Sequence, residues 1–244
     1  MTATDPAASG GLPTVVLVHG AFADSSSWTA VNRELAAQGF PVVCVANPLR
    51  DLEGDAAYVA SILGTIDGPK ILVGHSYAGS VITRAAADHE GVQALVYVAA
   101  FIPVVGESSG GLNTMFDGSL LVPDNLIARP TADGKTDLYV RADRFEQVYA
   151  GGLSPEGVAA AAGSQRPITA EALGGVLTAA PTRPIPVWQI VATEDHAVPT
   201  ELQRFLAERA GATVITADSG HDVPAARPAA VLAAIAEAAL VVVA

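Results

Sequence analysis

The sequence predicts an α/β fold, in which a doubly wound and mostly parallel sheet of about six core strands carries a helical cap insertion. Two observations predict the sheet. Short apolar segments rich in β-branched residues alternate with helical patterns nearly from end to end, and these segments are almost continuously apolar, as in strands covered by helices on both faces. A third observation predicts the cap, because the alternation stops once, over residues 103–186.

The predicted strands and helices alternate as right-handed crossovers require. The strands share short length and apolar character, and they span Thr14–Val18, Val42–Ala46, Ile71–Gly74, Ala94–Ala99, Val187–Ala192 and Thr213–Ala217. The helices span Ser27–Gln38, Asp51–Ile66, Ser80–His89, Thr200–Ala210 and Pro228–Leu240. Glycines at 39, 91 and 211 follow three of these helices, at the position where glycine commonly ends a helix.

The segment 103–186 has no apolar run of the core type but contains three helical pieces, over residues 143–149, 155–162 and 169–178. We expect it to cover the carboxyl edge of the sheet as a cap. Apolar side chains of the cap and of two sheet loops are then candidate walls of a pocket, although each could instead belong to a small core of the cap. The candidates are Phe22, Phe101, Met115, Phe116, Leu120, Leu121, Phe145 and Tyr149.

The chain is predicted to form a single domain over residues 13–244, after a flexible lead-in over residues 1–12. The lead-in lacks the basic start and apolar stretch of a secretory signal, so the prediction is a cytoplasmic protein. The apolar tract that ends the chain contains Glu237 and follows Arg227 and Pro228, which predicts a packed helix rather than a membrane span.

Charge and motif content limit the partners. The formal net charge is −12, and the 13 basic residues are scattered singly, so no basic patch for nucleic acid is predicted. The histidines lack paired metal-ligand spacing, and no glycine motif for a phosphate is present, so no metal and no cofactor are expected. A small-molecule substrate is the expected partner, and both a monomer and a homodimer remain open.

The most informative segment is Gly74–Gly79, which joins a predicted strand to a predicted helix. A serine at such a tight turn projects its hydroxyl above the carboxyl edge of the sheet, and the amide after it can donate to an oxyanion. Ser76 is therefore the candidate nucleophile. The segment departs from the pattern G-x-S-x-G at Ala78, and we expect Gly79 to ease the packing there.

A serine hydroxyl needs a base beside it, and the base needs a group that orients it. Of the five histidines, His221 follows the last predicted strand and lies at the edge to which Ser76 projects. The strand Val187–Ala192 is followed by two carboxylates, of which Asp195 is the better candidate acid because its shorter side chain orients an imidazole with less freedom. Glu194 is the reserve.

The oxyanion of such a reaction needs backbone donors. The amides of Ala21, after the first predicted strand, and of Tyr77, after the serine, are the expected pair, with Phe22 as the fallback for the first. A glycine at position 20 lets that loop come close.

These features together resemble the α/β-hydrolase superfamily. The resemblance is carried by residues 15–22, 27–28, 74–77, 96–101, 194–195 and 220–221 and spans about residues 13–239, cap included. More narrowly, the chain resembles bacterial serine hydrolases related to the plant methylesterases and hydroxynitrile lyases. This resemblance implies cleavage of a carboxylic ester, lactone or thioester of a small to medium, largely apolar molecule through an acyl-enzyme on Ser76.

Two other functions remain open. One is a carbon–carbon lyase that uses the same triad. Hydroxynitrile lyases resembling this group carry a lysine directly after the catalytic histidine, whereas this chain has Asp222, a charge of the opposite sign. The other is a ligand-binding member without catalysis, against which the intact serine, histidine and acid argue.

Overall fold

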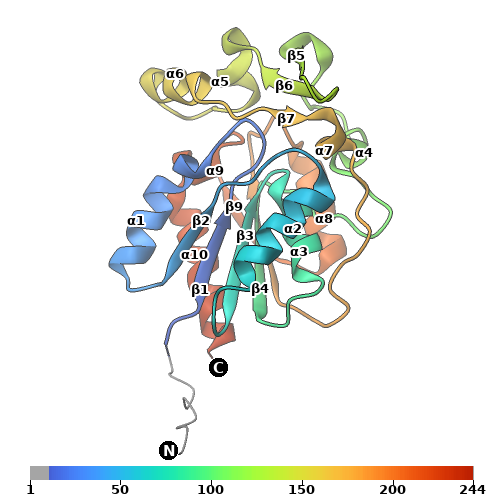
Figure 1. The fold of residues 1–244 in the computed structure, drawn as a ribbon. Helices are drawn as coiled ribbons and strands as arrows, with labels where there is room; N and C mark the ends of the chain where they lie inside the picture. Colours follow the sequence, from blue (N-terminus) through green and yellow to red (C-terminus); the bar gives the residue numbers. More distant parts are fainter. Residues whose placement is uncertain (1–10, 244) are drawn as a thin grey trace, which may run out of the picture.

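The computed structural model describes residues 11–243, so residues 1–10 of the predicted lead-in lie outside the described part. Six parallel strands form one twisted sheet in the order β2-β1-β3-β4-β8-β9 (Figure 1). Parallel neighbours joined through helices are the topology predicted. The strands are β1 (Thr14–Val18), β2 (Val42–Val45), β3 (Lys70–His75), β4 (Val92–Val98), β8 (Val187–Ala192) and β9 (Thr213–Ala217).

Helices cover both faces of this sheet, which confirms the doubly wound architecture (Figure 1). Successive side chains of a strand point to opposite faces, and β1 shows this directly. Val15 and Leu17 pack with α1 (Thr29–Ala37) and α10 (Pro228–Val242) on one face. Val16 and Val18 pack with α2 (Leu52–Leu63), α3 (Ala78–Ala86) and α8 (Thr200–Ala210) on the other. Because both faces of the sheet are covered, its central strands are buried and largely apolar.

Local capping explains where the first helices begin. The Asp24 carboxylate accepts the Ser26 N–H, so a short 3₁₀ turn, η1 (Ser25–Trp28), precedes α1 within the predicted single helix. The Asp51 carboxylate accepts the Gly54 N–H and starts α2 at Leu52. The α9 helix (Val223–Ala226) follows the last strand and precedes α10.

The cap between β4 and β8 is only partly helical, which corrects the predicted helical cap. It contains a three-stranded antiparallel sheet, β5-β6-β7, in addition to short helices. Gly134, with a φ of 83°, lies in the turn between β5 and β6, which form a hairpin. The elements are α4 (Ser109–Asn113), η2 (Pro123–Asn125), β5 (Leu126–Pro130), β6 (Thr136–Val140), η3 (Ala142–Arg144), α5 (Phe145–Val148), α6 (Pro155–Gly163), β7 (Ile168–Thr169) and α7 (Ala170–Gly174).

The cap lies over the carboxyl ends of the central strands, as predicted (Figure 1). Arg50, in the loop after β2, links the cap to the sheet domain. Its guanidinium pairs with Asp137 at 2.6 Å and donates to the Pro167 carbonyl at 2.8 Å. Phe145 and Tyr149 are buried in the same apolar cluster as α2, α3 and α8. Within residues 11–243, no helix combines the length and apolarity needed to cross a membrane.

Candidate active site

Ser76 occupies a strained turn between β3 and α3. Its φ is 57°, a left-handed value that side-chain-bearing residues rarely adopt, and its N–H donates to the Val98 carbonyl at 3.0 Å. Glycines allow the close approach around it. A Cβ at Gly20 would lie 2.6 Å from the His75 carbonyl oxygen, and a Cβ at Gly79 would lie 2.1 Å from the Phe101 carbonyl oxygen. The close approach therefore falls at position 79, and Ala78 is accommodated fully buried.

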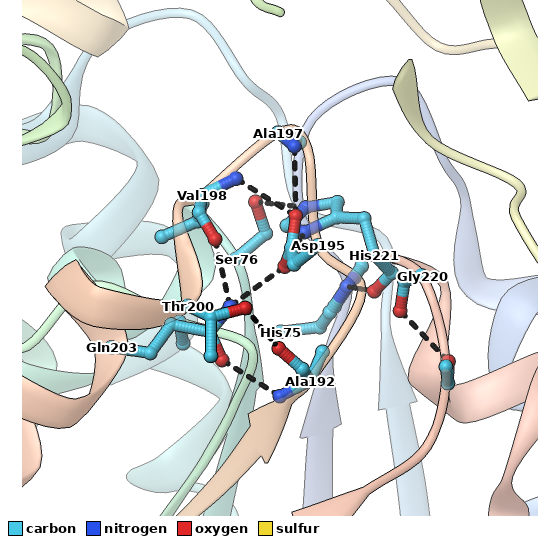
Figure 2. Close-up of polar contacts among 12 residues, drawn as sticks. His75, Ser76, Ala192, Asp195, Ala197, Val198, Thr200, Gln203, Gly220 and His221 are labelled. Atoms are coloured by element: carbon cyan, nitrogen blue, oxygen red, sulfur yellow. Dashed lines mark hydrogen bonds and ion pairs between the residues drawn. The ribbon is translucent and has the colours of Figure 1, made fainter. Parts of the chain in front are cut away.

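Three side chains from separate loops meet at the carboxyl edge of the sheet (Figure 2). The Ser76 Oγ lies 2.8 Å from His221 Nε2, and His221 Nδ1 lies 2.7 Å from Asp195 Oδ2. A carboxylate only accepts hydrogen bonds, so the Asp195 contact places the proton on Nδ1 and leaves the Nε2 lone pair facing the serine hydroxyl. All three residues are buried, with 4%, 2% and 5% of the surface of Ser76, His221 and Asp195 exposed.

The Asp195 carboxylate is held by four donors (Figure 2). Oδ1 accepts the N–H groups of Ala197 and Val198 at 2.8 and 2.9 Å, and Oδ2 accepts Gln203 Nε2 at 2.8 Å as well as the imidazole. The Gln203 amide is itself fixed, because its Oε1 accepts the Ala192 N–H and its Nε2 also donates to the Val198 carbonyl. The reserve acid, Glu194, is exposed and makes none of these contacts.

Two backbone amides beside Ser76 are free to donate. Ala21 and Tyr77 line the same cavity as Ser76 and His221, and within residues 11–243 neither amide donates to another protein group. The Phe22 N–H, the fallback, donates to the Arg166 carbonyl at 3.1 Å and is thereby occupied. The Tyr77 ring is held by its hydroxyl, which donates to Asp55 Oδ2 at 2.8 Å.

The family model of the alpha/beta hydrolase family matches residues 15–234, which is most of the chain and includes the serine, acid and histidine segments. The chain belongs to the alpha/beta hydrolase family. A search of curated proteins finds no match.

Solved structures share the fold of this alpha/beta hydrolase over nearly its whole length. They include a pyrethroid hydrolase from Sphingobium faniae JZ-2, at 24% identity and a TM-score of 0.78, covering 93% of this chain and 97% of that one. Methylesterase MES16 from Arabidopsis has 20% identity, a TM-score of 0.77 and coverage of 93% and 98%. Polyneuridine aldehyde esterase has 18% identity, a TM-score of 0.78 and coverage of 93% and 98%.

The cavity of this hydrolase beside Ser76 measures about 340 Å³. Of the predicted wall residues, Phe22, Phe101, Phe116 and Leu121 line it. The lining combines apolar side chains with short polar side chains from α4 and the turn after it. The sequence did not single out these additional lining residues: Ser109, Gly110, Asn113, Thr114, Asp117, Gly118, Ser119, Val122, Leu126 and Leu173.

The other four predicted wall residues lie elsewhere. Met115 turns outward and is 52% exposed. Leu120 packs against the apolar core, and its N–H donates to the His196 carbonyl. Phe145 and Tyr149 are buried in the cap's packing, their ring centroids 5.2 Å apart, so the alternative of a cap core holds for both.

The remaining histidines near the site of this hydrolase have structural partners. His75 Nε2 contacts the His221 carbonyl at 2.9 Å, and burial lowers the pKa of His75 well below 6.5, so it is a neutral donor that holds the histidine loop. His19 Nε2 accepts the Asn47 N–H at 3.0 Å, and burial lowers its pKa to about 4. His196 is exposed. Within residues 11–243, no group of three or more His, Cys, Asp or Glu side chains is placed to hold a metal ion.

Proposed function

We propose that this chain hydrolyses carboxylic esters through an acyl-enzyme on Ser76. The observation that carries the proposal is the unbroken series of contacts from Ser76 Oγ through His221 to Asp195, at 2.8 and 2.7 Å. A serine hydroxyl with an acceptor nitrogen at that distance can lose its proton as it attacks a carbonyl carbon. The esterases among the structural neighbours support the same reaction class.

The geometry suggests how each step proceeds. As Ser76 attacks, His221 takes its proton at Nε2, and Asp195 stabilises the imidazolium that results. The negative charge that develops on the carbonyl oxygen is accepted by the amides of Ala21 and Tyr77. His221 then returns the proton to the leaving alcohol, and a water molecule activated by the same nitrogen releases the acid. Removing one such amide donor typically costs about 10²–10³ in rate.

The cavity suggests the substrate class. A volume of about 340 Å³, with Phe22, Phe101 and Phe116 in its wall, suits a small to medium ester with an apolar body. The polar side chains of Ser109, Asn113 and Asp117 along one side suit a substrate with a polar group at a distance from the ester. Lactones and thioesters fit the same chemistry.

The lyase alternative receives little support from the site. Asp222, the residue after His221, does not line the catalytic cavity, so that position supplies no cation near Ser76 for a leaving cyanide. Release of cyanide from mandelonitrile, at a rate above that of a Ser76→Ala variant, would nonetheless restore this alternative.

Hydrolysis of short p-nitrophenyl esters tests the proposal. We expect Ser76→Ala to lose activity by about 10³-fold or more, and we expect a fluorophosphonate probe to label the wild type at Ser76 and not the variant. Ser61→Ala is the matched control, because Ser61 is exposed on α2 and its hydroxyl contacts only the Tyr58 carbonyl. Equal hydrolysis by wild type and Ser76→Ala would refute the proposal, and labelling without turnover would favour a ligand-binding protein.

A further inference from the structure

A second cavity, of about 260 Å³, lies beside the catalytic cavity, between helix α6 of the cap, the loop before η1 and the start of α9. Among the described residues, Phe22 is the only one that lines both cavities, so it lies where the two come closest. The proposed hydrolysis uses no residue on the far side of Phe22. What this second space holds is therefore a separate question.

Two residues that line this cavity each carry a buried oxygen without a hydrogen-bond partner. The Tyr149 hydroxyl and Asp222 Oδ1 have no partner in the described part of the chain, and Tyr149 and Asp222 are 2% and 4% exposed. Leaving such a group unpaired costs about 1–3 kcal/mol. Buried polar groups in folded proteins are almost always satisfied, so a missing partner from outside the chain is the direct explanation.

The charge of the lining indicates what that partner is. Asp222 and Asp24 contribute two carboxylates, whereas no lysine or arginine of the described residues lines the cavity. Asp24 already accepts from Ser26, and Asp222 receives the Ala225 N–H, so Asp222 Oδ1 is the carboxylate oxygen that lacks a donor. An anion would meet like charge here, and a hydrogen-bond donor with a positive charge would satisfy Asp222 and could also donate to the tyrosine oxygen.

The remaining walls indicate the body of the ligand. Phe22, Leu153, Ala160 and Ala161 form apolar surface, and the volume is below that of a drug-sized pocket. We propose that this cavity is a binding site for a small organic ammonium ion with an apolar body, whose ammonium group bonds to Asp222 and Tyr149.

The protonation of Asp222 agrees with this site. Burial raises the pKa of Asp222 to about 6, and the neighbouring His221 and a hydrogen bond from the Ala225 N–H only partly oppose that rise. The other charged or titratable groups close by are Tyr149, Asp24, Asp195 and Arg166, whose charge acts on Asp24. At neutral pH the cavity therefore holds a buried carboxylate that no lysine or arginine among its described lining residues neutralises, and an ammonium ligand would neutralise it.

Calorimetric titration with benzylamine tests the site at about pH 8, where the amine is protonated. We expect saturable binding to the wild type and no comparable binding of benzyl alcohol, which has the same shape without the charge. Asp222→Asn should weaken benzylamine binding by about tenfold or more, and Tyr149→Phe by less, because hydrogen bonds to charged groups are the stronger ones. Because the readout is binding, its outcome does not depend on the proposed ester hydrolysis.

The matched control is Asp117→Asn, which removes a carboxylate from the catalytic cavity instead. It should leave benzylamine affinity unchanged. Ala161→Phe, which fills the second cavity from α6, should abolish binding and checks the site by bulk rather than by charge. The proposal would be overturned by wild-type protein that binds no amine, by equal affinity in Asp222→Asn, by benzyl alcohol binding as tightly as the amine, or by Asp117→Asn as the variant that loses binding.

Discussion

At the scale of single residues, Gln203 has a defined task in the site. It donates to Asp195 Oδ2, the same oxygen that contacts His221, and it is fully buried at the start of α8. We propose it as a positioning residue that fixes the plane of the carboxylate. Substitution of an outer hydrogen-bond partner of this kind typically lowers activity by about 10–100-fold.

Gln203→Leu therefore should lower kcat for ester hydrolysis by about tenfold or more, with little change in KM, because the cavity that binds substrate is untouched. Steady-state kinetics check this, and circular dichroism shows whether the variant remains folded. Gln93→Leu is the control, since Gln93 is exposed on β4 and donates only to the Glu90 carbonyl. A rise in KM with unchanged kcat would contradict the positioning role.

Asp222 carries a second prediction, about stability and pH. Its pKa is about 6 in the folded protein against 3.8 as the ordinary value, so the folded state binds this proton more tightly than the unfolded state does. The free energy of unfolding should therefore fall as pH rises between about 4 and 6, and above that window the charged carboxylate should cost about 3 kcal/mol.

Asp222→Asn removes that charge without changing the shape. We expect its free energy of unfolding, measured by urea denaturation, to exceed that of the wild type by about 3 kcal/mol at pH 8 and to equal it near pH 4. A constant difference across that range would show that Asp222 does not titrate between the folded and unfolded states as argued.

The residues of the triad and those of the pocket differed in how well the sequence predicted them. Ser76 directly follows an apolar strand, Asp195 and His221 lie in the loops just after two others, and parallel strands bring those ends to one edge, so their meeting was predictable. The role of Gln203 was not predictable, because the sequence does not show whether a glutamine on an amphipathic helix lies on its buried face.

At the scale of elements, the sheet was predictable because its central strands are buried and hence largely apolar. Three of the six strand predictions differ from the structure at their ends by one or two residues, as with β3, which begins at Lys70 rather than Ile71. The cap strands β5 and β6 escaped prediction for the opposite reason. They are largely exposed or half-buried and carry Arg129, Pro130 and Asp137, so no continuous apolar run marks them.

The cap also explains why half of the predicted pocket walls were wrong. An apolar side chain in an insertion can face the substrate or the insertion's own packing, and sequence does not distinguish the two. Tyr149 illustrates this: its ring lies 5.0 Å from that of His221, measured between centroids, yet Tyr149 lines the second cavity and not the catalytic one.

At the scale of the whole molecule, the net charge of −12 affects which ligands reach the two cavities. A strongly negative protein attracts cations from solution and does so less at high salt. Among the described residues, Phe22 alone lines both the space that we assign to the ester and the space that we assign to the ammonium ion, and it is 3% exposed. The position of that ring decides whether the two ligands can meet.

Phe22→Ala should join the cavities. We expect the variant to raise kcat/KM for p-nitrophenyl octanoate relative to the acetate by about tenfold, because the longer chain gains apolar contacts beyond the former partition. Benzylamine, which should not compete with the ester in the wild type, should become a competitive inhibitor of the variant. Loss of the ring leaves a cavity that costs about 3–5 kcal/mol, so a thermal melt must first show that the variant is folded at the assay temperature.

The Phe116→Ala variant distinguishes the effect of an enlarged catalytic cavity from the effect of joining the two cavities. Phe116 also lines the catalytic cavity, but its ring packs at a tilt against that of Phe205 on α8, and it does not line the second cavity. Removal of the Phe116 ring should raise kcat/KM for p-nitrophenyl octanoate relative to the acetate, without making benzylamine a competitive inhibitor. If benzylamine competes equally in both variants, or in neither, Phe22 is not the partition, and the two cavities act independently of its ring.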